Sequence, residues 1–238
     1  MPKTLTYKDV FRFVPNLIGY TRVLFTAAAA FSMYYKCPTT MFLSYALSEL
    51  LDAADGHYAR KLGQCSKFGE VLDMVTDRCT TTILLTYLAE LYDSRALALF
   101  FNFITVLDIS SHYMQMYSQL ITGKTNHKQM SNDAHWILKA YYTDRRVLFA
   151  FCFGNESFFL LLYVNKFISS TPLLYVSVAI TVLAFPLFFI KNYINLIQLY
   201  ESAKDLAKLD AATLNSSAKG KDSSVASAPS RKTAKKKL

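Results

Sequence analysis

The chain has 238 residues, of which 53% are hydrophobic and only 7 are glycine, and its formal net charge at pH 7 is +9. Its apolar residues come in runs close to the ~20 residues that a helix needs to cross a hydrocarbon core of about 30 Å, which excludes an ordinary soluble domain. The charge does not indicate a nucleic-acid partner, because nine Lys and Arg against four Asp and Glu from Glu201 onward account for +5 of it. A basic flank beside anionic membrane lipid explains that excess. We therefore predict an all-α polytopic membrane protein.

The start of the chain predicts a short segment that lies in the membrane interface. In the stretch TYKDVFRFVPN, aromatic and aliphatic residues are mixed with Lys8, Asp9 and Arg12. This mixture suits a short helix lying along the lipid head groups. A frayed terminus explains the same composition equally well.

Six apolar segments follow, and each is long enough for a membrane-spanning helix. They cover residues 16–35, 39–55, 73–91, 96–121, 147–164 and 172–199. Basic residues in short loops favour the cytoplasmic side, and they gather before the first segment, after the second and fourth, and in the tail. The other loops carry only Lys36, Arg95 and Lys166. We therefore predict that both termini and the two long loops are cytoplasmic.

The last part of the chain predicts a disordered basic tail, residues 201–238, behind a membrane domain of residues 1–200. The tail is rich in Ala, Ser and Lys and, after position 200, has no aromatic residue, so it can bury little apolar surface. Its end, KKKL, places Lys235 and Lys236 fourth and third from the carboxyl terminus. This resembles the dilysine retrieval signal of endoplasmic reticulum membrane proteins, although a Lys-rich end also arises by chance.

Four aspartates lie at the edges of the second and third segments, in the stretch LLDAADGHYARKLGQCSKFGEVLDMVTDRC. Asp52 and Asp55 are three residues apart and Asp73 and Asp77 are four apart, so each pair shares one face of a helix. An antiparallel hairpin of the two helices brings the four carboxylates together near the cytoplasmic interface. So much negative charge at that depth is costly, and hard divalent cations such as Mg²⁺ or Mn²⁺ resolve it. Any one of these residues alone also fits a helix cap or a solvated loop.

The predicted loop between the two pairs, residues 56–72, carries residues that suit a phosphate ligand. Gly56 and Ala59 let a bulky ligand approach the backbone, and Arg60 offers a planar fork for phosphate oxygens. Ser66 offers a hydroxyl donor. Two metal ions beside such a segment can clamp the attacking and leaving oxygens of a displacement at phosphorus.

Eight positions together form the pattern Asp-x2-Asp-Gly-x2-Ala-Arg-x8-Gly-x3-Asp-x3-Asp, from Asp52 to Asp77. Without a departure, this resembles the motif of the CDP-alcohol phosphatidyltransferases. These six-helix membrane enzymes transfer a phosphatidyl or related group from a CDP-linked lipid to an alcohol and release CMP. Dimerisation is usual among them, so the resemblance also implies a homodimer.

The resemblance implies a role for each matching position. A pair of Mg²⁺ or Mn²⁺ ions would be held by the four aspartates, Asp52, Asp55, Asp73 and Asp77. Asp77 would also act as the general base that takes a proton from the acceptor hydroxyl. The CDP part of the donor, CDP-diacylglycerol, would contact Gly56, Arg60 and Ser66.

Candidate residues for binding the acceptor alcohol lie in the stretches LDISSHYMQMY and YYTDRR; they are Asp108, Ser111, His112, Arg145 and Arg146. A polyhydroxylated acceptor needs several such hydrogen-bond partners. Interhelical hydrogen bonds and arginines that reach to the head groups explain the same residues. These stretches, with GNESFF and the pair His127 and Lys128, resemble the eukaryotic phosphatidylinositol synthases of that family.

The resemblance therefore implies transfer of a phosphatidyl group from CDP-diacylglycerol to myo-inositol, in the endoplasmic reticulum membrane, with the Golgi as a second location. Two alternatives stay open. A sibling enzyme would use the same catalytic residues with glycerol phosphate, serine or choline as the acceptor. A divalent cation carrier or channel would need acidic residues that continue across the membrane, where only Glu49, Asp108 and Glu156 lie deep.

Overall fold

The computed structural model describes residues 4–122 and 136–226, and every regular element in these two ranges is an α-helix. The helices are α1 (Tyr7–Phe11), α2 (Val14–Tyr34), α3 (Pro38–Lys61), α4 (Lys67–Leu91), α5 (Arg95–Thr122), α6 (Trp136–Thr143), α7 (Arg145–Asn165) and α8 (Thr171–Ala226). The all-α prediction is confirmed. Each of the six long helices overlaps one of the six predicted apolar segments, and α1 lies within the predicted short segment at the start of the chain.

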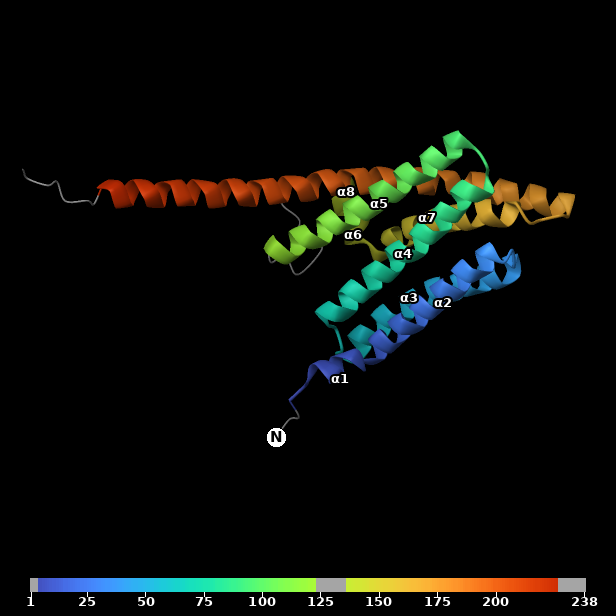
Figure 1. Cartoon of the computed structure of the whole chain (residues 1–238), viewed down its shortest axis with the longest axis horizontal. Coiled ribbons are helices and arrows are strands. Elements are labelled where there is room, and N and C mark those ends of the chain that lie inside the picture. Colours follow the sequence, from blue (N-terminus) through green and yellow to red (C-terminus); the bar gives the residue numbers. More distant parts are fainter. Residues whose placement is uncertain (1–3, 123–135, 227–238) are drawn as a thin grey trace, which may run out of the picture.

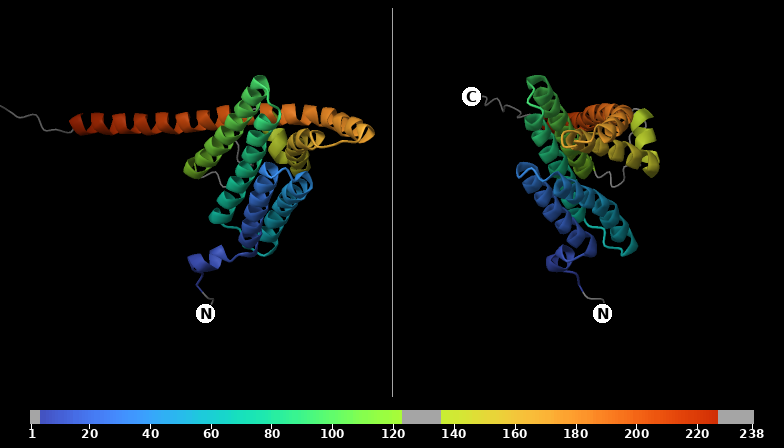
Figure 2. Two further views of the ribbon diagram at one scale, coloured as in Figure 1. Left: turned by 45° about the vertical axis from the view of Figure 1, so that its right-hand side comes forward. Right: turned by 90° about the vertical axis from the view of Figure 1, so that its right-hand side faces the viewer.

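Helix α4 lies between two groups of helices (Figures 1 and 2). On one side, α2 and α3 form an antiparallel hairpin, and α2 packs against α4. On the other side, α5 packs against α4 and α8, and α7 packs against α8. The hydrophobic core joins both groups through Leu84, Leu85 and Leu88 of α4, together with Met33, Met41, Phe159 and Phe188. A side chain that α4 presents can therefore meet residues from most of the bundle.

The connection between α3 and α4 differs from the prediction. Instead of a loop over residues 56–72, helix α3 continues to Lys61 and α4 begins at Lys67. The helix ends in a Schellman motif: Gly63 has a φ of +62°, and the Gln64 N–H donates to the Ala59 carbonyl at 2.9 Å. Ser66 caps α4 by accepting from the Gly69 N–H at 3.0 Å. Gly56 and Arg60 consequently lie on a helix, one turn apart.

The prediction of a disordered tail from residue 201 is wrong for residues 201–226, which continue α8 (Figure 1). Ala, Leu and Lys are strong helix formers, and helix α8 propagates through them without a new nucleation step. Lys204 pairs with Glu201 at 3.3 Å, and Ser202 is buried. Lys235 and Lys236 lie outside the described residues.

Three of the described helices are long and apolar enough to cross a membrane. They are α5, residues Arg146–Asn165 of α7, and residues Thr171–Ser217 of α8. Helices α3 and α4 carry the aspartate pairs, which lower their mean hydropathy. The structure thus agrees with a membrane protein.

Candidate active site

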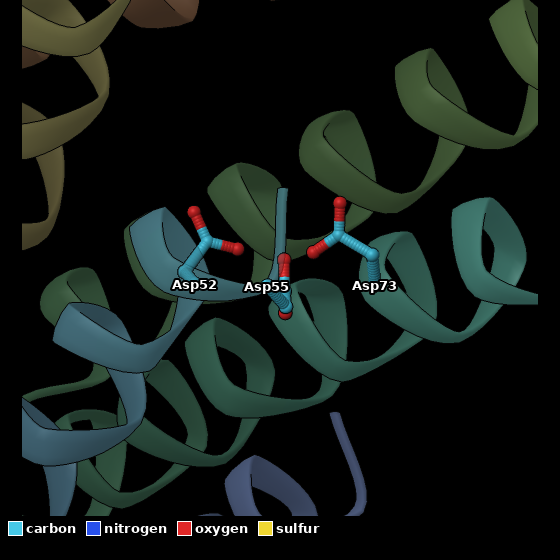
Figure 3. A group of neighbouring side chains, drawn as sticks. All are labelled: Asp52, Asp55 and Asp73. Atoms are coloured by element: carbon cyan, nitrogen blue, oxygen red, sulfur yellow. The ribbon is translucent and has the colours of Figure 1, made fainter. Parts of the chain in front are cut away.

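The four motif aspartates converge where α3 faces α4. Carboxylate oxygens of Asp52, Asp55 and Asp73 all lie within 4.8 Å of one another. Figure 3 shows the carboxylates of Asp52 and Asp73 turned toward each other, with Asp55 between them. Asp77, one turn after Asp73, accepts a hydrogen bond from the same arginine as Asp55 and Asp73. The structure therefore brings together all four residues predicted to bind metal.

That arginine is Arg22 of α2, a residue that the motif does not contain. Its side chain is 0% exposed. Its Nη1 lies 2.6 Å from Asp73, 2.8 Å from Asp52 and 2.9 Å from Asp55, and its Nη2 donates to Asp77. One guanidinium thus contacts every carboxylate of the group.

The sequence carries a signal for Arg22 that the motif search missed. Spaced three and four residues apart, Asn16, Gly19, Arg22 and Thr26 lie on one face of α2, and all four are buried. A polar stripe of this kind on an apolar helix indicates a face turned into a polar site. Thr26 continues the stripe by bonding Thr80 of α4 at 2.7 Å.

The donor atoms of the group fit a hard divalent cation. Four carboxylates surround the guanidinium of Arg22, and even with Arg78 3.5 Å from Asp77 the carboxylates outnumber the guanidinium groups by two. Carboxylate oxygens are the ligands that Mg²⁺ and Mn²⁺ prefer. Excess negative charge at a partly buried site favours cation binding.

A cavity of about 450 Å³ opens directly beside the carboxylates. It is lined from α3 and α4 by Asp55, Gly56, Arg60, Ser66 and Asp73. All three residues predicted to bind the donor therefore share one cavity with two of the predicted metal ligands. The lining also includes Asn16, Gln64 and Lys67, which the motif does not single out.

Two glycines, Gly56 and Gly69, line this cavity. A Cβ at Gly56 would lie 3.3 Å from Nη1 of Arg60, so a side chain here would crowd the guanidinium that lines the cavity. A Cβ at Gly69 would lie 2.7 Å from Oδ1 of Asn16, which is too close. Helices α2 and α4 approach each other closely here because Gly69 has no side chain.

Three of the five acceptor candidates lie together on α5. Asp108 and Ser111 are buried, and the Ser111 hydroxyl donates to the Asp108 carbonyl at 3.0 Å. Nδ1 of His112 lies 2.8 Å from that carbonyl. Asp108 also forms an ion pair with Arg78, the residue after Asp77, so the group reaches the motif through α4.

Of the other two acceptor candidates, the structure describes the side chain of Arg146 alone, and it does not join this group. Arg146 is 93% exposed and pairs with Asp144 at 3.2 Å. The backbone N–H and guanidinium of Arg146 hold the pKa of Asp144 below its usual value. Arg145 begins α7, and its side chain is outside the described part of the structure, as are His127 and Lys128.

A second group of polar residues, most of them buried, lies outside the predicted site residues. Glu156 of α7 accepts hydrogen bonds from the Tyr45 hydroxyl at 2.6 Å and from the Thr81 hydroxyl at 3.2 Å. On α8, Lys191 donates to Asn195, which in turn donates to Asp108 at 3.4 Å. These contacts link α3, α7 and α8 to the site on α4.

Comparisons with known proteins agree with this geometry. The family model for CDP-alcohol phosphatidyltransferase matches residues 12–200. A human CDP-diacylglycerol–inositol 3-phosphatidyltransferase is 42% identical over 212 residues, which cover 86% of this chain and 96% of the human protein. Proteins of that name from Schizosaccharomyces pombe (40% identity, 85% and 92% covered) and Saccharomyces cerevisiae (41%, 90% and 94%) are similarly related. No solved structure matches. With its complete motif and a family match over most of its length, the chain belongs to the CDP-alcohol phosphatidyltransferase family.

Proposed function

We propose that this protein is a phosphatidylinositol synthase, which transfers the phosphatidyl group of CDP-diacylglycerol to myo-inositol and releases CMP. One observation carries the proposal: the four motif carboxylates converge beside a cavity that Gly56, Arg60 and Ser66 line. Relatives of about 40% identity over most of their length, named for this reaction, support the same substrates.

The cavity is the proposed site of the donor's CDP group. Arg60 presents a guanidinium fork that binds phosphate oxygens in a bidentate manner. Gly56 leaves space beside that fork, and Ser66, the N-cap of α4, lines the same cavity. The two acyl chains of the donor lie between the helices, among membrane lipid.

Asp52, Asp55, Asp73 and Asp77 are the proposed ligands of two divalent cations, Mg²⁺ or Mn²⁺. When bound, such ions supply the positive charge that stabilises the phosphoryl oxygens and the departing CMP. The protein's own contribution is to fix the carboxylates, which two helices and Arg22 hold in place.

Asp77 is the proposed general base. Its carboxylate takes the proton of an inositol hydroxyl while that oxygen forms a bond to the lipid phosphorus. The bond between this phosphorus and the oxygen of the CMP phosphate breaks, and CMP leaves with the electron pair. Asp77 lies one turn after Asp73 on α4, and in this proposal the acceptor meets the donor phosphate beside it.

The acceptor enters from the cytosol and is recognised by residues drawn from Asp108, Ser111, His112, Arg145 and Arg146. The first three support this best, because they form one polar group connected to Asp77 through Arg78. All six long helices span the membrane in this proposal, with both termini and the active site cytoplasmic. We place the enzyme in the endoplasmic reticulum, with the Golgi as a second location, as a homodimer.

The proposal is tested by supplying purified protein in liposomes with CDP-diacylglycerol and one radiolabelled alcohol at a time. The alcohols are myo-inositol, serine, glycerol phosphate and choline. We expect a labelled phospholipid with myo-inositol alone. A labelled phospholipid with another alcohol instead would contradict the acceptor assignment. The assignment of the donor site would still hold, and the protein would be a sibling enzyme.

A further inference from the structure

A partly buried chain of ion pairs and a hydrogen bond runs from Asp77 through Arg78 and Asp108 to Asn195 of α8, and the proposed mechanism gives Arg78 no part. Arg78 Nη1 donates to both carboxylate oxygens of Asp108, at 2.6 and 2.7 Å. Its Nη2 lies 3.5 Å from Oδ2 of Asp77. A single guanidinium therefore joins the proposed base on α4 to a carboxylate on α5.

Two guanidinium groups contact the carboxylate of Asp77, one at each oxygen. Arg22 of α2 donates to Oδ1, and Arg78 faces Oδ2. The other charged groups that interact with it are carboxylates, which repel it: Glu49, Asp52, Asp55 and Asp73. The orientation of Asp77 therefore depends on where these two guanidinium groups are held.

Asp108 is placed to fix the position of the Arg78 guanidinium. Its side chain is 7% exposed, and both its oxygens accept from Arg78. On the α8 side, Asn195 donates to Oδ1 at 3.4 Å and is itself held by Lys191 at 2.5 Å. The Nε of Arg78 is buried without a hydrogen-bond partner among the described residues, so the two carboxylates are what fixes its guanidinium there.

We infer that Arg78 is a positioning residue for the reaction. Asp108 fixes the guanidinium of Arg78, and Arg78 in turn orients Asp77 toward the acceptor hydroxyl. This inference rests on the proposed function and changes one part of it: Asp108 acts through Arg78 rather than by touching the acceptor. Lysine cannot replace Arg78, because a point charge does not bridge two carboxylates in a fixed fork. A small misplacement of a catalytic group can lower a rate by about 10²-fold.

The test is a double-mutant cycle of Arg78→Lys, Asp108→Asn and the double variant, with Arg95→Lys as the matched control. Arg95 is exposed at the start of α5, away from the polar group. For each protein, kcat and the two KM values are measured with CDP-diacylglycerol and myo-inositol. Thermal stabilisation by CDP with Mn²⁺ is measured as a readout that needs no turnover.

We expect each single variant to lower kcat roughly 10- to 100-fold, with both KM values and the stabilisation by CDP kept within about threefold. The double variant should be no slower than the slower single variant, because both changes break one connection. Multiplying effects in the double variant would overturn the inference. A raised KM for inositol in Asp108→Asn alone would overturn it as well and make Asp108 an acceptor contact.

Two further measurements keep the outcomes separable. Asn195→Ser removes the amide that donates to Asp108 from α8, and we expect it to lower kcat less than Asp108→Asn does. This variant replaces the Asp108 variants if they do not fold. Wild-type kcat in folded Asn195→Ser would contradict the inference. Failure of the proposed function is distinguishable from failure of this inference, because the wild-type protein itself would then give no product with inositol.

Discussion

Arg22 of α2 donates from Nη1 to Asp73 of α4 at 2.6 Å, across 51 residues of the chain. The contact places a buried positive charge between the two aspartate pairs of the motif. Because the same guanidinium also meets Asp52, Asp55 and Asp77, Arg22 ties α2 to the α3–α4 hairpin.

Replacing Arg22 by methionine should make stability depend on divalent cations. Removing one partner of a buried ion pair costs about 3–5 kcal/mol, since it leaves buried charge uncompensated. Bound cations compensate the same carboxylates, so we expect a large fall in Tm in EDTA and a smaller one in excess Mg²⁺ or Mn²⁺. Equal falls under both conditions would contradict the placement of the cations. Arg12→Met, at an exposed position, is the control.

Asp77→Asn should abolish most turnover and leave the donor bound. Loss of a general base lowers kcat by about 10²–10⁴-fold, whereas Gly56 and Arg60 still line the cavity. Rates of CMP release and thermal stabilisation by CDP check the two halves of this prediction. The control is Asp93→Asn, an exposed site with a φ of +41° that asparagine tolerates. Normal turnover in Asp77→Asn would rule out the proposed base.

Arg60→Lys should raise the KM for CDP-diacylglycerol about tenfold or more. A hydrogen bond to a charged group contributes about 1.5–3 kcal/mol, and lysine cannot make the bidentate contact. Steady-state kinetics with varied donor and saturating inositol measure the effect. Lys61→Arg serves as the control, because Lys61 is exposed and does not line the cavity. An unchanged donor KM in Arg60→Lys would show that Arg60 does not touch the donor.

Gly154→Ala should destabilise the packing of α7 on α8. The new Cβ would lie 2.6 Å from both Cβ and Cδ1 of Leu187. Overpacking of this kind costs about 1–3 kcal/mol, so Tm should fall while both KM values stay the same. Adding Leu187→Ala removes Cδ1 and keeps Cβ, so it should restore only part of the lost stability. A double variant less stable than either single one would contradict this explanation.

The motif predicted which carboxylates meet, because its parts are close in sequence. Asp52 to Asp77 lie on two consecutive helices, so helical spacing and one hairpin determine where the carboxylates meet. Arg22 joins them only through tertiary packing, and no local pattern in the motif points to it. Its place on a buried polar stripe of α2 is the signal that was available.

Helix ends were less predictable than helix positions. The charged residues after Asp55 suggested a long loop, yet Gly63, in a left-handed conformation, is what ends α3. Composition also suggested disorder after residue 200, whereas α8 continues to Ala226. In both places local helix propensity outweighed the polarity of the sequence.

The most direct measurement is CMP release by the purified protein with CDP-diacylglycerol, measured with and without myo-inositol and with Mg²⁺, Mn²⁺ or EDTA. We predict release that requires both inositol and a divalent cation and that Asp77→Asn loses. Release from folded wild-type protein that persists in EDTA, or that is independent of inositol, would contradict the assignment of the four carboxylates to a metal-dependent inositol transferase.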